Sequence, residues 1–149
     1  MNSNFYICEL QNLLMTKVMI VENSEKPLWS VKQLLAAINY DVVFETGNGY
    51  EAVEKYDLIK PDLVFVDLNP SKNDGLSIIQ EIKNKHAESK IIIMSKQSNS
   101  KILNDCMSAG AIDCITTPIK MKEFVSFVTS IDRSESTKPT VAPVLSKEN

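Results

Sequence analysis

Hydrophobic positions in this chain alternate between short continuous runs and stretches with helical spacing. The runs predict five strands, at residues 18–21, 40–45, 62–67, 91–94 and 111–116. Apolar residues that recur every three or four positions predict five helices, at residues 26–39, 50–59, 75–85, 100–109 and 121–131. Because the central runs are apolar at every position, we expect a parallel sheet covered by helices on both faces, which is an α/β fold.

Composition narrows the class of protein. A chain of 149 residues accommodates one domain with a full core, and 44% hydrophobic with 23% charged residues is typical of a globular protein. The net charge of −3 argues against direct binding of nucleic acid, since domains that bind phosphate backbones are usually basic. No apolar run reaches membrane-spanning length, so no membrane association is expected.

Cysteine and histidine content excludes several kinds of site. The three cysteines, Cys8, Cys106 and Cys114, are far apart and form no CxxC pair. This pattern predicts neither a disulfide framework nor a zinc site, and it favours a reducing cytoplasm. The one histidine, His86, lies in a polar stretch that predicts a solvated helix end. A Ser-His-Asp triad or a histidine-ligated metal is therefore not expected.

The two ends of the chain differ from the rest. Residues 1–16 form an N-terminal extension with apolar residues but no basic residue before Lys17, which is not a secretory signal. The extension is either a short amphipathic segment or a result of start-codon choice, because Met15 would also make a natural beginning. Residues 132–149 are rich in Ser, Thr, Pro, Lys and Glu and predict a disordered polar tail, too short for an output module.

Asp67 is the most informative polar residue, because it ends a buried strand and precedes a polar loop. In open α/β sheets, ligands bind in the loops beyond the carboxyl ends of the strands. The first strand ends in Glu22 and Asn23, and in such a sheet it lies next to the third. We therefore expect these three side chains to converge in an acidic pocket suited to Mg²⁺. The alternative is that Glu22 and Asn23 only cap the following helix.

The chain also resembles a known family over residues 17–131. The matching features are Val21-Glu22-Asn23, the strand that ends at Asp67, Asn73-Asp74-Gly75, Ser95, Gly110-Ala111 and Pro118. Together they are similar to the receiver domain of two-component response regulators, of the kind found in chemotaxis regulators. The resemblance implies a doubly wound, flavodoxin-like (βα)5 fold, with a five-stranded parallel sheet in the order 2-1-3-4-5.

The resemblance also implies a mechanism. Asp67 would accept a phosphoryl group from a histidine kinase or a phosphotransfer protein and become an aspartyl phosphate. Mg²⁺ would be held by Asp67, by Glu22 and Asn23, and by the backbone carbonyl of Asn69. The hydroxyl of Ser95 would turn inward to bond the new phosphate, as the phosphate switch.

Several positions depart from the family pattern. Glu22 and Asn23 replace the usual acidic pair, so weak Mg²⁺ binding is expected. Thr117 stands at the position of the family's lysine, and Cys114 stands at that of its switch aromatic residue. Lys96 follows Ser95, where the family usually has a small residue. Two lysines are candidate substitutes for the missing cation, Lys96 and Lys120; the alternative is that both point to solvent.

These features favour a stand-alone phosphorelay receiver that is not an enzyme and signals by protein contact. Its expected partner surface is the face of the fourth helix, fifth strand and fifth helix, whose apolar residues include Ile102, Leu103, Cys106, Met107 and Phe127. Trp29 and Tyr50 suit an interface too, although a lone Trp on an amphipathic helix often serves packing. The main alternative is a degenerate pseudo-receiver that binds a protein without being phosphorylated. A flavodoxin-like enzyme is disfavoured, because residues 22–25 form no glycine-rich phosphate loop.

Overall fold

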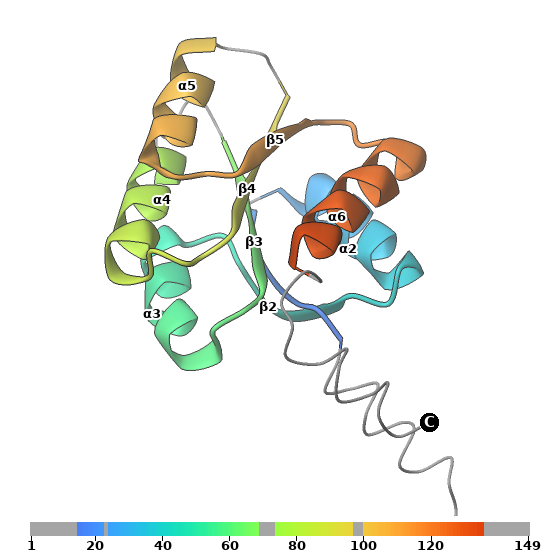
Figure 1. Ribbon diagram of the computed structural model, residues 1–149, viewed down its shortest axis with the longest axis horizontal. Coiled ribbons are helices and arrows are strands. Elements are labelled where there is room, and N and C mark those ends of the chain that lie inside the picture. The colour runs from blue at the N-terminus through green and yellow to red at the C-terminus, as the bar shows by residue number, and fades with distance from the viewer. Residues whose placement is uncertain (1–14, 23, 69–73, 97–99, 136–149) are drawn as a thin grey trace, which may run out of the picture. The chain divides into compact units, whose positions relative to one another are not determined.

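The computed structural model describes residues 15–22, 24–68, 74–96 and 100–135. They form five strands that alternate with five helices (Figure 1). The elements are β1 (Lys17–Val21), α2 (Glu25–Ala37), β2 (Asp41–Thr46), α3 (Gly49–Ile59), β3 (Leu63–Asp67), α4 (Asp74–Lys85), β4 (Ile91–Ser95), α5 (Ser100–Ala109), β5 (Asp113–Thr116) and α6 (Met121–Glu135). None of these helices is both long and apolar enough to cross a membrane.

The chain divides into two units, residues 1–119 and 120–149. The first unit contains the sheet and the helices α2 to α5. The second contains α6, whose amide at Phe124 donates to the carbonyl of Lys120 at 2.9 Å.

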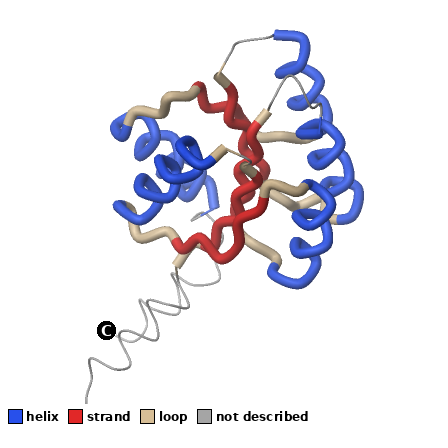
Figure 2. The backbone as a smooth tube through the Cα atoms, turned by 180° about the vertical axis from the view of Figure 1, so that it is seen from behind, coloured by secondary structure: helices blue, strands red, loops and turns tan. Residues whose placement is uncertain are grey.

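The five strands form one parallel sheet in the order β2-β1-β3-β4-β5, which confirms the expected flavodoxin-like topology. Figure 2 shows the strands as a single twisted layer. The strand pairing sets the ends of the central strands in register: Val21 lies opposite Val66, and Asp67 lies opposite Met94. This register decides which side chains meet at the carboxyl edge of the sheet.

The hydrophobic pattern agrees with the burial of each element. All five residues of β4 and the first four of β3 are buried, as expected for strands covered on both faces. Helices α3, α4 and α5 lie side by side on one face of the sheet, and α2 lies on the opposite face (Figure 1). The core on the α3–α5 face consists mainly of Met19, Val21, Val53, Tyr56, Val64, Val66, Ile79, Ile82, Ile91, Ile93 and Cys106.

Two boundaries differ from the sequence-based expectation. Strand β5 begins at Asp113 and not at Ala111, because the amide of Ala111 still donates to the carbonyl of Cys106 in α5, at 3.1 Å. Helix α6 continues to Glu135, so the expected polar tail from residue 132 begins inside a helix. Residues 132–135 are mostly charged, and charged residues are compatible with a helix. The change to polar residues at 132 therefore does not mark the end of α6. Residues 1–14 and 136–149 lie outside the described residues.

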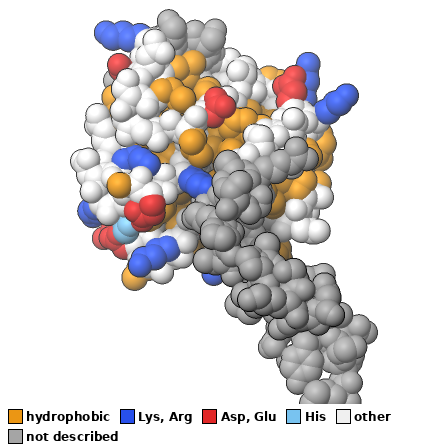
Figure 3. Space-filling view, viewed as in Figure 1, with side chains coloured by type: hydrophobic (Ala, Val, Ile, Leu, Met, Phe, Trp, Pro, Cys, Tyr) orange, Lys and Arg blue, Asp and Glu red, His pale blue; other side chains and the backbone are white. Residues whose placement is uncertain are grey.

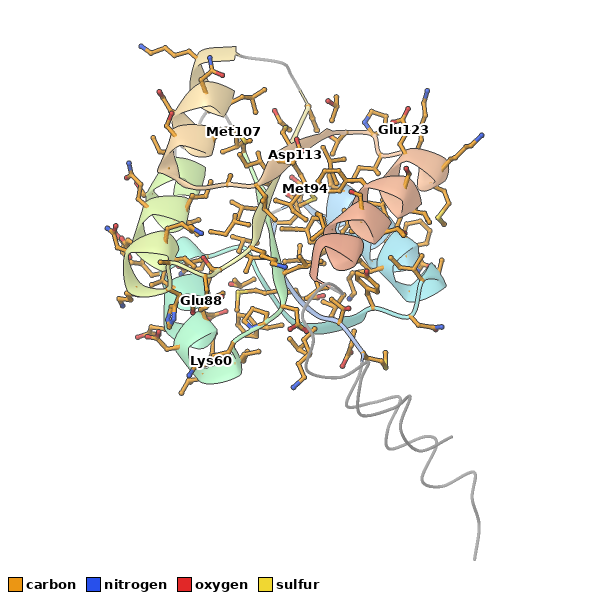
Figure 4. The ribbon with its side chains drawn as sticks, viewed as in Figure 1. Lys60, Glu88, Met94, Met107, Asp113 and Glu123 are labelled. Carbon is orange, nitrogen blue, oxygen red and sulfur yellow. The ribbon has the colours of Figure 1, made fainter. Side chains whose placement is uncertain are left out.

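His86 lies at the end of α4, as expected, but its side chain is less solvated than its polar neighbours suggested. Only 17% of its side chain is exposed. Its Nε2 pairs with the carboxylate of Asp57 in α3, its Nδ1 lies 3.6 Å from the carboxylate of Glu88, and its ring centroid lies 4.7 Å from that of Tyr56. The hydrogen bond to His86 lowers the pKa of Asp57. The histidine, coloured pale blue in Figure 3, therefore links the end of α4 to α3. Figure 4 labels Glu88 and Lys60, which follow these two helices.

Replacing Gly110 by Ala is expected to destabilise the fold by about 1–3 kcal/mol. Gly110 has a φ of 120°, and a Cβ placed there would lie 2.7 Å from Cε of Lys83. Lys83 has little freedom to move away, since its Nζ donates to the carbonyls of Ala87 and Ser89 at 2.7 and 2.9 Å. Urea unfolding measures the loss, with Ser108→Ala, an exposed position two residues earlier in α5, as control. Equal unfolding midpoints for the Gly110→Ala variant and the wild type would contradict this account.

Candidate functional site

Three adjacent strands end side by side and bring together Glu22, Asp67 and Ser95. Glu22 follows Val21, and Asp67 follows the residue opposite Val21 on β3. The amide of Leu68 donates to the carbonyl of Met94 at 2.8 Å, which places Ser95 next to the end of β3. Because all the strands are parallel, these side chains share the carboxyl edge of the sheet, where ligands bind in this class of fold.

Glu22 and Asp67 are in direct contact. The Glu22 side chain is almost completely buried and is hydrogen-bonded to that of Asp67. Its Oε1 also accepts a hydrogen bond from the amide of Ser24, at 2.9 Å. Glu22 thus supports the backbone that leads into α2 and also interacts with Asp67.

The pKa of the Asp67 carboxyl is raised, and the cause is burial. The hydrogen bond to Glu22 and the positive charge of Lys96 both lower this pKa, but they offset only part of the effect of burial. Asp67 is therefore a poorly solvated carboxylate that lies where a ligand can reach it. Groups with these properties are more frequent in functional sites than elsewhere.

Ser95 and Thr117 lie beside this pair at the ends of β4 and β5. Ser95 is 7% exposed, and its carbonyl accepts a hydrogen bond from the amide of Thr117 at 2.8 Å. The peptide bond between Thr117 and Pro118 is cis. Oγ1 of Thr117 is buried and has no hydrogen-bond partner among the described residues, a feature that sequence reasoning missed. No signal in the sequence reveals the pairing of a single threonine hydroxyl.

The two candidate substitute cations are not equivalent. Lys96 is exposed and directly follows β4, and its charge acts on the carboxylate of Asp67. Lys120 begins the second unit, so its position relative to Asp67 is not described. Of the two lysines, Lys96 is the one with an electrostatic link to the pocket.

Cys106 and Cys114 are packing residues. Cys106 is buried in the core cluster, and the partly buried Cys114 packs against that cluster from the position of the switch aromatic residue. Burial raises the pKa of both thiols, so they stay protonated at neutral pH and are poor nucleophiles and metal ligands. Cys8 lies outside the described residues.

The donor set of the pocket fits a hard divalent cation. Carboxylate oxygens are the ligands that Mg²⁺ prefers, and Glu22 and Asp67 supply them at the same edge of the sheet. Within the described residues, no three side chains of the types His, Cys, Asp and Glu cluster closely enough to hold a metal ion. The other two expected ligands, Asn23 and Asn69, lie outside the described residues.

The expected partner surface is only partly exposed in the first unit. Cys106 is buried, Ile102 and Leu103 pack against the core, and Met107 is 40% exposed on α5 (Figure 4). Phe127 belongs to the second unit, so the surface as a whole is not described.

Trp29 and Tyr50 both lie on the surface, so packing is not their main role. Trp29 is 65% exposed on α2, and Tyr50 is 81% exposed on α3. Exposed aromatic side chains of this size are more typical of interaction surfaces than of cores.

Comparison with known proteins agrees with this geometry. The model of the response regulator receiver domain family matches residues 18–129. The chemotaxis protein CheY of Bacillus subtilis is 34% identical, with 70% of this chain and 87% of that protein aligned. CheY of Thermotoga maritima is 30% identical, with 78% of this chain and 98% of that protein aligned.

Solved structures show the same likeness. A response regulator from Thermotoga maritima is 27% identical, with a TM-score of 0.71 over 79% of this chain and 98% of that one. The CheX–CheY–BeF3–Mg²⁺ complex from Borrelia burgdorferi has a TM-score of 0.72 at 24% identity, over 78% of this chain and 88% of that one.

Proposed function

The chain belongs to the response regulator receiver family of two-component signalling, and we propose that it accepts a phosphoryl group on Asp67 and signals by contact with another protein. The observation that carries this proposal is the position of Asp67, a half-buried carboxylate at the carboxyl end of β3, between Glu22 and Ser95. A structural role alone would not require a charged group at this buried edge.

In the proposed reaction, an Oδ atom of Asp67 attacks the phosphorus of the donor. The bond from phosphorus to the donor's nitrogen or oxygen breaks, and the leaving group keeps the electron pair of that bond. The product is an aspartyl phosphate, which is more negative than the carboxylate it replaces. Burial helps the attack, because a poorly hydrated carboxylate has less water to shed before it reaches the phosphorus.

The charge of the phosphoryl group has to be balanced. We propose that the hydroxyl of Ser95 donates a hydrogen bond to a phosphoryl oxygen, and that Lys96 supplies the positive charge missing at Thr117. Lys120 is the second candidate for that charge. Glu22, Asn23, Asp67 and the carbonyl of Asn69 would hold Mg²⁺, which neutralises charge on the transferring group. Binding is expected to be weak, because Asn23 is uncharged and Glu22 already bonds the amide of Ser24.

We propose that the chain works as a stand-alone receiver and not as an enzyme in its own right. The two CheY proteins are matched over 87% and 98% of their own lengths, so a single receiver makes up nearly the whole of each. The phosphoryl donor would be a histidine kinase or a phosphotransfer protein. The output would be another protein bound at the face of α5, β5 and α6.

The alternative is a pseudo-receiver that binds its partner without phosphorylation. Two features favour it: Asp67 shares a hydrogen bond with Glu22, and Thr117 stands where the family has a lysine. The intact Asp67 and Ser95 speak against it, since a constitutive binding module has no need of either.

Incubation with acetyl phosphate and Mg²⁺, followed by intact mass measurement, tests the proposal. We expect a gain of one phosphoryl group that builds up slowly, because the pocket lacks two favourable charges. Removal of Mg²⁺ by EDTA is expected to abolish the gain. No gain, either with acetyl phosphate or with histidine kinases, would favour the pseudo-receiver.

A further inference from the structure

A hollow lies between α3 and α4, which are adjacent on the same face of the sheet (Figure 1). Its volume is about 420 Å³. It is lined by Gly47, Asn48, Gly49, Tyr50 and Val53 on one side and by Ser77, Ile78 and Glu81 on the other. Gly47 directly follows β2, whose last carbonyl, at Thr46, accepts the amide of Glu22 at 2.9 Å. The α3–α4 hollow therefore adjoins the same edge of the sheet as Asp67.

The floor of the hollow is rigid and apolar. Val53 and Ile78 are each 6% exposed and belong to the core cluster. Helix α3 begins at Gly49, where an added Cβ would lie 2.7 Å from Cδ1 of Ile78. Oδ1 of Asn48 fixes this end of the helix by accepting the amides of Tyr50 and Glu51, at 2.9 and 3.3 Å. The hollow is thus part of the folded structure and does not depend on the position of a mobile side chain.

The rim of the hollow carries three exposed polar side chains, Tyr50, Ser77 and Glu81. Within the described part of the chain, none of the three makes a side-chain hydrogen bond or an ion pair. A carboxylate can only accept hydrogen bonds, and the face of a tyrosine ring attracts cations. The rim is therefore complementary to a cationic hydrogen-bond donor.

We propose that the α3–α4 hollow receives an arginine side chain from a partner protein. Glu81 is the one charged residue that lines it within the described residues, and Glu51 and Glu54 lie on the neighbouring surface of α3. A guanidinium group stacks on an aromatic ring and also donates two hydrogen bonds to one carboxylate, whereas a lysine ammonium is a point charge. A single carboxylate in an open hollow would bind a free small cation only weakly. We therefore expect the arginine to belong to a polypeptide that makes further contacts around the hollow.

A titration followed by ¹H–¹⁵N NMR tests the proposal on the full chain. The probe is a capped peptide with one arginine flanked by glycines, and its match is the same peptide with uncharged citrulline. We expect the arginine peptide to shift the amides of Gly47 to Tyr50 and of Ser77 to Glu81, and the citrulline peptide to leave them in place. The Glu81→Gln variant is expected to bind about fivefold more weakly, while the exposed Glu54→Gln on α3 serves as control.

The outcomes separate the hollow from general attraction to an acidic surface. Three results would each overturn the proposal. They are an equal loss of affinity for the arginine peptide in Glu54→Gln and Glu81→Gln, equal amide shifts with the citrulline peptide, and amide shifts spread over the whole surface. The exposed Tyr50→Leu variant gives a second test that leaves the core intact, and unchanged affinity in it would count against the aromatic contact and so against arginine. No phosphoryl donor is present, so the result is independent of the proposed phosphorylation of Asp67.

Discussion

The Asp67→Asn variant is expected to take up no phosphoryl group and, at neutral pH, to unfold at a higher temperature than the wild type. The loss of uptake follows because the amide has no carboxylate oxygen to attack phosphorus. The gain in stability follows from the raised pKa of Asp67, whose ionised form is poorly solvated in the folded protein. An asparagine removes that charge, and its amide group can still donate a hydrogen bond to Glu22.

The direction of the pH dependence follows from proton binding. The unfolded chain releases the Asp67 proton near pH 4, whereas the folded protein holds it to a higher pH because burial raises the pKa. The folded state then binds more protons, so the contribution of Asp67 to stability is fully present below pH 4 and is lost as pH rises through the folded pKa. Asp67 is only half-buried, and water screens its charge, so we expect a difference of about 1 kcal/mol or less.

Thermal unfolding between about pH 3.5 and pH 7.5, a range that covers the titration of carboxyl groups, measures this effect. The wild type is expected to lose stability relative to Asp67→Asn as pH rises, and Mg²⁺ is expected to raise the unfolding temperature of the wild type alone. The matched control is Asp62→Asn, since Asp62 is an exposed carboxylate just before β3 whose Oδ2 accepts the amide of Lys17 at 2.8 Å. An Asp67→Asn variant less stable than the wild type at neutral pH would contradict the argument.

The fold was predictable because burial imposes a strong pattern on the central strands. Strands covered on both faces read as continuous apolar runs, as residues 63–66 and 91–94 do, and their order followed from the resemblance to a family. Boundaries were less predictable where local hydrogen bonds decide them. Ala111 looks like part of a strand, yet its amide completes the end of α5.

The site was predictable only as far as the strand ends define it. Parallel strands in register bring Glu22, Asp67 and Ser95 to one edge, once the strand order is taken from the resemblance to the family. The pairing of His86 with Asp57 was missed, because their contact joins two helices and leaves no mark in the local sequence. Two other features also depend on packing in three dimensions. They are the burial of the Thr117 hydroxyl and the effect of the Lys96 charge on Asp67.

The Lys96→Met variant is expected to accept a phosphoryl group about tenfold more slowly than the wild type, because an electrostatic partner of the transferring group is lost. Lys96 follows Ser95 at the end of β4, and its charge acts on Asp67. The effect should be smaller than that of a buried cation, since the lysine side chain is exposed and partly screened by water. Methionine keeps most of the length of the side chain and removes the ammonium group, with its charge and its hydrogen-bond donors.

Two further variants decide whether position 96 matters through its charge. Adding Thr117→Lys to Lys96→Met restores a cation at the position of the family's lysine and is expected to recover most of the rate. Lys85→Met, an exposed lysine in the last turn of α4, removes one positive charge without a link to the pocket and is expected to leave the rate unchanged. Rates come from the time course of intact mass at saturating Mg²⁺. If the Lys96→Met variant is phosphorylated as fast as the wild type, the charge of Lys96 does not assist the reaction. Lys120 would then be the next residue to replace.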